Sequence, residues 1–211
     1  MKTGLIVAMS SEYDALKRAG LSTVALSGIG KVNAAATATE MILKQKPDCI
    51  INSGCAGSVK DEVKMFDVVI GRQTAHHDVW CGEPNAFGVV EGCPQRFEAD
   101  PYLLSVAESL QLGDRMHSGL ICSGDQFFIS MEEDARILSL YPDCLACDME
   151  SAAIAQVCAR YGIPFLSFRV ISDVHTSDEA QKASYSDFWG QLAGDSFNVL
   201  KQLIDKIIAV R

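Results

Sequence analysis

The 211-residue chain has few basic residues: 18 Lys and Arg stand against 27 Asp and Glu, a formal net charge of −9. Nucleic acids and anionic membrane surfaces attract basic proteins, so neither is an expected partner. No apolar run reaches the ~18 residues that span a bilayer. The first residues also lack the long apolar stretch of a secretory signal. We therefore expect a cytoplasmic protein.

The chain also lacks internal repeats, low-complexity tracts and a Pro/Gly/Ser-rich linker. We therefore predict one domain over residues 1–211. It has eight cysteines, but the only close pair, Cys144 and Cys147, has no second pair and no histidine nearby. Because a zinc site needs four ligands, no metal is expected, and disulfides are uncommon in cytoplasmic proteins. We expect reduced thiols and no cofactor.

Several catalytic and phosphate-binding motifs are missing as well. The phosphate-binding pattern GxxxxGK[ST] and the serine-nucleophile pattern GxSxG are absent, and Asn33 stands where GxGxxG needs its third glycine. Two other glycine segments are present, Gly28–Gly30 and Gly54–Gly57. Each can be a tight turn between strand and helix, or a loop that lets a ligand approach the backbone. The sequence leaves both interpretations open.

Apolar strands alternate with helical patterns along the whole chain. Strands are predicted at residues 2–9, 22–27, 48–53, 65–72, 117–122, 144–149 (strand or turn) and 164–172. Helices are predicted after an N-terminal cap at Ser10 or Ser11 and at residues 31–46, 100–110, 132–140, 151–161 and 188–210. Residues 75–99 are predicted to form a long loop. This order predicts an α/β fold, a three-layer α/β/α arrangement with a mixed, mostly parallel central sheet.

Small and acidic residues follow five of the predicted strands, where ligands gather in such sheets. The segments are Ser10-Ser11-Glu12, Gly28-Ile29-Gly30, Gly54–Gly57, Ser123-Gly124-Asp125 and Ser172-Asp173. Glu12, Asp148 and Glu150 precede or begin helices and can be helix caps. Asp173 follows so apolar a strand that we expect a partly desolvated carboxyl group able to donate a proton. Convergence of these carboxyl groups indicates acid–base chemistry on a neutral organic substrate.

Six segments, in order, resemble the nucleoside phosphorylase/hydrolase superfamily, and most of all its 5′-methylthioadenosine/S-adenosylhomocysteine nucleosidases. They are MxxE at 9–12, SGIGKVNAA at 27–35, NSGCAGS at 52–58, SGDQF at 123–127, DMESAAIA at 148–155 and RVISD at 169–173. The resemblance covers nearly the whole chain. It implies hydrolysis of the N-glycosidic bond between adenine and a 5′-thioribose, without metal or cofactor.

The resemblance also implies a role for each catalytic position. Asp173 is the general acid that protonates adenine N7, and Ser172 helps to orient it. Glu12 activates the attacking water with Arg169 nearby, while Glu150 accepts hydrogen bonds from the ribose hydroxyls. The remaining substrate-binding positions are Ile29, Cys55, Ala56, Gly57, Phe127, Phe128, Ile129, Asp148, Met149 and Tyr185. Among these, the ring of Phe127 is expected to stack on adenine.

Three features depart from the family pattern. Cys55 stands where the family usually has serine, and a thiol is a weaker hydrogen-bond partner than a hydroxyl. Tyr185 takes the place of a phenylalanine in the pocket for the 5′ substituent, which would make that pocket more polar. Only fourteen residues lie between Glu12 and Ser27, fewer than the family usually has. A smaller central sheet is therefore expected.

The resemblance leaves the reaction and assembly partly open. A carboxylate at Glu12 repels phosphate, so a hydrolase is favoured over a purine nucleoside phosphorylase. Aminodeoxyfutalosine remains an alternative substrate, and a non-catalytic nucleoside-binding protein is a third possibility. The segment 76–97, with Trp80 and Phe87, implies a homodimer in which this segment reaches the partner's pocket.

Overall fold

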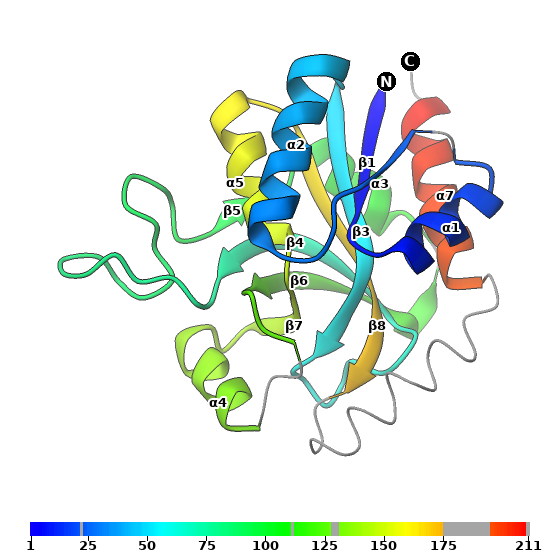
Figure 1. The fold of residues 1–211 in the computed structure, drawn as a ribbon. Helices are drawn as coiled ribbons and strands as arrows, with labels where there is room; N and C mark the ends of the chain where they lie inside the picture. Colours follow the sequence, from blue (N-terminus) through cyan, green and yellow to red (C-terminus); the bar gives the residue numbers. More distant parts are fainter. Residues whose placement is uncertain (22, 111, 128–130, 175–194, 210–211) are drawn as a thin grey trace.

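The computed structural model describes residues 1–21, 23–110, 112–127, 131–174 and 195–209 (Figure 1). Strands and helices alternate, as predicted. In chain order they are β1 (Thr3–Val7), α1 (Ser10–Arg18), β2 (Val24–Leu26), α2 (Lys31–Gln45), β3 (Cys49–Ser58), β4 (Val68–His76), β5 (Phe97–Glu98), α3 (Pro101–Glu108), the 3-10 helix η1 (Gly113–Arg115), β6 (Met116–Ser123), α4 (Met131–Leu140), β7 (Cys144–Asp148), α5 (Ser151–Tyr161), β8 (Phe165–Val174) and α7 (Asp195–Ala209).

The strands form one mixed sheet, which confirms the predicted fold class. Five of the eight pairings between described strands are parallel and three are antiparallel. Part of this sheet closes on itself, because β3 pairs with β8, β8 with β4, β4 with β6, β6 with β7, and β7 with β3 again. The sequence analysis did not anticipate this ring of five strands.

Each strand of the ring contributes one residue to a single buried cluster that fills it. These residues are Ala56, Val69, Ile121, Ala146 and Ile171. Two of the five are alanines, and small side chains suit the interior of so narrow a ring. The ring fixes the ends of β3, β7 and β8 close together, and these ends carry the residues of the candidate site.

Helices cover both faces of the open part of the sheet (Figure 1). On one face, α2 and α5 pack through Ala38, Met41 and Ile154, with Ile6 and Ile50 from the strands. The other face is covered by α1, α3 and α7. None of the helices in these ranges is long and apolar enough to cross a membrane.

Three details differ from the sequence-based expectations. β3 does not end at Ser53 but continues to Ser58, and the predicted loop at 75–99 contains the short strand β5. Helix α1 begins at Ser10 and is preceded by Met9 in extended conformation, so neither predicted serine cap is correct. Of the predicted C-terminal helix, the part before residue 195 lies outside the described residues.

The apolar face of α2 is also rotated from the predicted one. The prediction placed Val32, Ala35, Ala36, Ala38, Met41 and Ile42 on it. In the structure Ala34 joins Ala38, Met41 and Ile42 in the core, whereas Val32 is 79% exposed. An alanine-rich helix carries little periodic signal, because alanine is tolerated on either face.

Candidate active site

Glu12 lies in the first turn of α1, directly after β1, and its carboxylate is buried. Oε2 accepts hydrogen bonds from the backbone N–H groups of Ala8 at 3.0 Å and Met9 at 2.9 Å. Oε1 accepts one from the N–H of Cys55 in β3 at 2.9 Å. Burial raises the pKa of Glu12, although Arg169 and these N–H groups oppose the shift. The carboxylate therefore caps its own helix and also bridges β1 and β3.

The side chains of Glu12 and Arg169 both lie against the backbone of Gly54. A Cβ atom added there would lie 2.6 Å from Glu12 Oε1 and 2.7 Å from Arg169 Nη1, closer than any real contact. The φ angle of Gly54 is +143°, which also favours glycine. This segment is neither the turn nor the loop considered from sequence; it is strand whose missing side chains make room for two charged groups.

Arg169 lies in the middle of β8 and is one of the largest fully buried side chains among the described residues. Its Nη2 is 2.7 Å from Asp148 Oδ2 and 3.5 Å from Glu150 Oε2, and it also contacts Asn52. Burial alone would lower the pKa of Arg169, but Asp148, Glu150 and Glu12 together hold it above its ordinary value. One buried cation thus serves three carboxyl groups.

Glu150 follows β7 and its carboxyl group is held from two sides. Oε1 accepts a hydrogen bond from the N–H of Gly30 at 3.0 Å, and Oε2 faces Arg169. Burial raises the pKa of Glu150 to about 7, an effect that Arg169 opposes and Asp148 reinforces. The glycine segment Gly28–Gly30 is therefore bound to this carboxyl group through its backbone.

Asp173 lies at the end of β8, where the strand is bulged. Ile171 pairs with Ala56 and Asp173 with Gly57, so Ser172 is the extra residue. The Ser172 hydroxyl donates a hydrogen bond to Asp173 Oδ1 at 2.6 Å. Bulges next to active sites redirect side chains, and here both polar side chains stay buried at the end of the strand.

Cys55 follows Gly54 in β3, and its thiol is affected by three of these charged groups. Burial raises the pKa of its thiol well above the ordinary value; Glu12 and Asp173 add to the shift, while Arg169 opposes it. The thiol is therefore protonated at neutral pH and is a poor nucleophile. The position of Cys55 among the substrate-binding residues stays a prediction.

The other predicted substrate-binding positions have different surroundings. Asp148 is buried and accepts hydrogen bonds from the N–H groups of Glu150 and Ser151, so it caps α5 and holds Arg169. Ala56 is buried, Gly57 and Met149 are half-buried, and Ile29 and Phe127 are exposed. Phe128, Ile129 and Tyr185 lie outside the described residues.

Three polar residues that support the site were given no role from sequence, although Ser123 was named in one of the five strand-end segments. Asn52, Ser123 and Ser151 are buried; Asn52 and Ser151 contact Arg169, and Ser123 donates to Asp148 at 2.5 Å. Asn52 interrupts the apolar run CIIN of β3. Buried polar groups are nearly always hydrogen-bonded, so a polar residue within so apolar a strand was the available signal.

No metal site accompanies these carboxyl groups within the described ranges, where no cluster of three or more His, Cys, Asp or Glu residues is arranged to hold an ion. The eight cysteines are all free thiols. The site combines buried carboxyl groups, one buried cation and backbone N–H donors, a set of groups that can exchange protons with a ligand.

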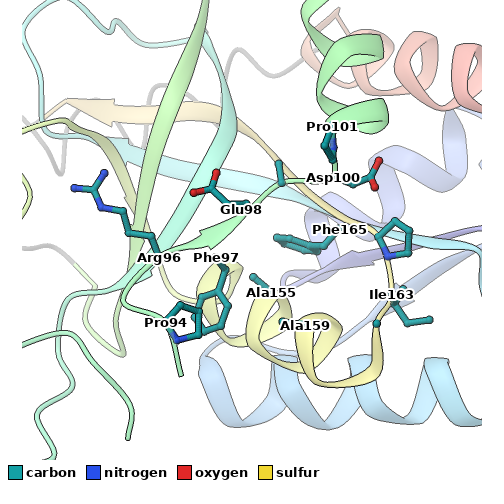
Figure 2. Close-up of a pocket in the computed structure, with 13 residues that line it drawn as sticks. Pro94, Arg96, Phe97, Glu98, Asp100, Pro101, Ala155, Ala159, Ile163 and Phe165 are labelled. Carbon is teal, nitrogen blue, oxygen red and sulfur yellow. The ribbon is translucent and has the colours of Figure 1, made fainter. Parts of the chain in front are cut away.

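A cavity of about 540 Å³ lies at the other end of β8 (Figure 2). It is lined mostly by apolar residues, among them Phe97, Ile163 and Phe165. Its charged residues have partners within the chain: Arg96 binds Asp143, and Asp100 caps α3. This cavity is therefore separate from the place where the buried carboxyl groups meet.

Known proteins share both the sequence and the fold. The family model for the phosphorylase superfamily matches residues 18–205. A 5′-methylthioadenosine/S-adenosylhomocysteine nucleosidase of Actinobacillus succinogenes is 42% identical over 176 residues, which cover 80% of this chain and 74% of that protein.

Two solved structures extend the match. The nucleosidase of Neisseria meningitidis in complex with methylthio-immucillin-A gives a TM-score of 0.88 at 35% identity, covering 97% of this chain and 99% of that one. Futalosine hydrolase of Helicobacter pylori gives 0.88 at 28% identity, covering 98% of both chains. The chain thus belongs to the phosphorylase superfamily and, within it, to the 5′-methylthioadenosine/S-adenosylhomocysteine nucleosidase family of N-ribosyl hydrolases.

Proposed function

We propose that the protein hydrolyses the N-glycosidic bond of 5′-methylthioadenosine, S-adenosylhomocysteine or both, and releases adenine. One observation carries this proposal: the side chains of Glu12 and Arg169 both lie against Gly54, and Arg169 also faces the carboxylate of Glu150. Asp173 lies at the bulged end of β8, where it pairs with Gly57 and acts electrostatically on Cys55. These residues provide an acid, a base and an acceptor for hydroxyl groups without a cofactor.

In the proposed reaction, protonated Asp173 donates its proton to adenine N7. The C1′–N9 bond breaks and its electron pair stays with adenine, so positive charge develops on the ribose ring. Water then attacks C1′ and Glu12 accepts the proton that the water loses. The hydrogen bond from Ser172 to Oδ1 of Asp173 orients the carboxyl group for this transfer.

Glu150 is proposed to bind the ribose hydroxyls, and Phe127 to stack on adenine. Both edges of the Glu150 carboxylate are anchored, by Gly30 and by Arg169. An anchored acceptor is already oriented for the ribose hydroxyls before the nucleoside binds, so binding costs little reorganisation. Phe128, Ile129 and Tyr185 are further binding positions implied by the family resemblance.

Adenine release in phosphate-free buffer tests the reaction class. We expect the same rate with and without added phosphate, because the buried carboxylate of Glu12 lies where a phosphate nucleophile would have to approach. Release that depends on phosphate would identify a phosphorylase instead. No release from any purine nucleoside, combined with adenine binding, would identify a binding protein.

A second candidate substrate is a futalosine-type nucleoside. Futalosine hydrolase of Helicobacter pylori has the same fold over 98% of this chain, and Cys55 changes a pocket position. A panel of methylthioadenosine, S-adenosylhomocysteine, aminodeoxyfutalosine and inosine separates the candidates. We expect the highest kcat/KM with one of the two thioethers.

We further propose that the active form is a homodimer. Trp80 and Phe87 are exposed on the segment between β4 and β5, and Ile29 and Val32 are exposed beside the site. Exposed apolar side chains of this size commonly mark contact surfaces. Light scattering coupled to size-exclusion chromatography should give twice the chain mass of 22.8 kDa; a fully active monomer would contradict the proposal.

A further inference from the structure

Three chain segments that follow different strands meet at the edge of the candidate site, through Lys31, Asp78 and Asp125. Lys31 begins α2, Asp78 follows β4, and Asp125 follows β6. The Lys31 ammonium group is 2.6 Å from Asp78 Oδ1. Asp78 Oδ2 accepts a hydrogen bond from the N–H of Asp125 at 2.9 Å, and Asp125 Oδ1 accepts one from the N–H of Lys31 at 2.8 Å.

These three hydrogen bonds form a closed loop, because each residue contacts both of the others. The side chains of Lys31 and Asp78 are only 19% and 21% exposed, so water screens their ion pair less than it screens a surface pair. Burial alone would raise the pKa of Asp78, but Lys31 and the N–H of Asp125 outweigh it and hold the pKa below the ordinary value. The loop is therefore a fixed part of the fold.

The loop touches the site at two points. The N–H next to that of Lys31, on Gly30, donates the 3.0 Å hydrogen bond that anchors Glu150 Oε1. Gly30 has φ of +96°, and a Cβ atom there would lie 3.1 Å from Asp125 Oδ1, so the glycine segment is pressed against the Asp125 carboxylate. Asp125 is also only two residues from Phe127.

We propose that Lys31, Asp78 and Asp125 are positioning residues that hold Glu150 and Phe127 for nucleoside binding. This inference rests on the function proposed above. None of the described contacts of the three residues is made with Glu12 or Asp173, the groups assigned to proton transfer. Loss of the loop should therefore weaken binding of substrate and transition state alike, which raises KM and leaves kcat nearly unchanged.

The test compares Lys31→Met with Lys44→Met, a substitution near the other end of the same helix. Lys44 also forms an ion pair, 2.5 Å from Glu40, but both side chains are largely exposed. For Lys31→Met we expect KM for methylthioadenosine to rise about tenfold with kcat within about twofold, and Lys31→Arg to restore most of the loss. Lys44→Met should leave both constants within about twofold of the parent values.

Two readouts keep this inference separate from the proposed function. Amide hydrogen exchange at Asp125 should accelerate about tenfold in Lys31→Met and not in Lys44→Met, because Asp78 loses the cation that fixes it. Adenine affinity, measured by calorimetry, should fall in the same variant. Unchanged hydrogen exchange at Asp125 in Lys31→Met, or a loss in kcat at constant KM, would overturn the positioning role. Adenine release by the parent protein would still uphold the proposed function. An inactive parent would overturn the proposed function, and exchange would still decide whether the loop exists.

Discussion

The two ends of strand β8 differ in how their polar groups are used. At the Asp173 end, buried carboxyl groups share one buried cation, Arg169. At the Phe165 end, the cavity of Figure 2 has a volume of about 540 Å³, yet its charged residues are paired with the chain itself. The same strand and the same helix, α5, contribute to both ends.

The comparison teaches that buried charge, and not the presence of a cavity, distinguishes the candidate site from the other end of the strand. Keeping a carboxyl group out of water is costly unless it is paired, and Glu12 and Glu150 have raised pKa values because one cation does not compensate them fully. Such a cost is tolerated where the group has work to do on a ligand. The apolar cavity carries no comparable cost.

Of all the substitutions, Asp173→Asn should cause the largest loss of activity, and a matched substitution at the Phe165 end of β8 should cause almost none. Asparagine keeps the shape of the side chain but cannot protonate adenine N7, so we expect kcat to fall about 10³-fold while adenine affinity changes by less than about threefold. Asp143→Asn, which removes a charge that pairs with Arg96 beside the cavity, is the matched control and should change kcat by less than twofold (roughly). An active Asp173→Asn variant would remove Asp173 from the mechanism.

Gly54→Ala should come next. The added methyl group would overlap the positions of Glu12 Oε1 and Arg169 Nη1, and displacement of such groups by about 1 Å can cost about 10²-fold in rate. Gly20→Ala is the control, because Gly20 also has positive φ, +88°, but has nothing within 4 Å of an added Cβ. Both variants should lose stability in thermal melts, and only Gly54→Ala should lose kcat/KM; equal activities would contradict the contact.

The pH dependence of kcat/KM should report on Glu150. Its pKa is raised to about 7, and the ionised form accepts the ribose hydroxyls, so kcat/KM should fall about tenfold per pH unit below about 7. Glu150→Gln should be less active but lack this limb. An unchanged limb in that variant would assign the titration to another group, with Glu12 the first candidate.

The same shift affects stability in the opposite direction to an ordinary ion-paired carboxyl group. Between the ordinary value of 4.5 and about 7 the folded state holds a proton that the unfolded state has released. The free energy of unfolding should therefore decrease as the pH rises through this range, and the decrease should be smaller in Glu150→Gln. Urea titrations at pH 5 and pH 8 measure it.

Ala159→Leu should have the smallest effect. Ala159 is exposed at the cavity of Figure 2, and leucine would fill part of the cavity without touching the carboxyl groups. We expect kcat/KM within roughly twofold of the parent value. The same substitution at buried Ala56, whose carbonyl faces Ser172, should abolish most of the activity. A tenfold loss in Ala159→Leu would show that the cavity is coupled to the site.

Much of the fold could be predicted from the sequence, because its strands are short apolar runs separated by helices. The convergence of the five polar strand ends also follows from the sequence, and the structure brings Glu12, Arg169 and Glu150 together as expected. The closed ring could not be predicted, since it depends on antiparallel pairings of β7 and β4 with distant strands.

The residues that support the site from outside, such as Gly54, Lys31 and Asp78, could not be predicted from the sequence either. Nothing in the sequence around Gly54 indicates that two charged side chains lie where its Cβ atom would be. The sequence around Lys31 likewise does not distinguish it from other lysines at the start of a helix. The two polar contacts of Asp78 come from residues 47 positions away in the chain. Pairing over such distances has no local signal, so only the folded chain reveals it.

The closed ring has a consequence for the order in which activity can appear during synthesis. β3 becomes part of the ring only when β7 and β8 are available, and both are encoded in the last third of the chain. Contacts between such distant segments form late and slowly. A nascent chain that ends at α4 already contains Glu12 but neither Arg169 nor Asp173. Hydrolysis should therefore begin in one step, when the ring closes, and truncated chains should have no partial activity.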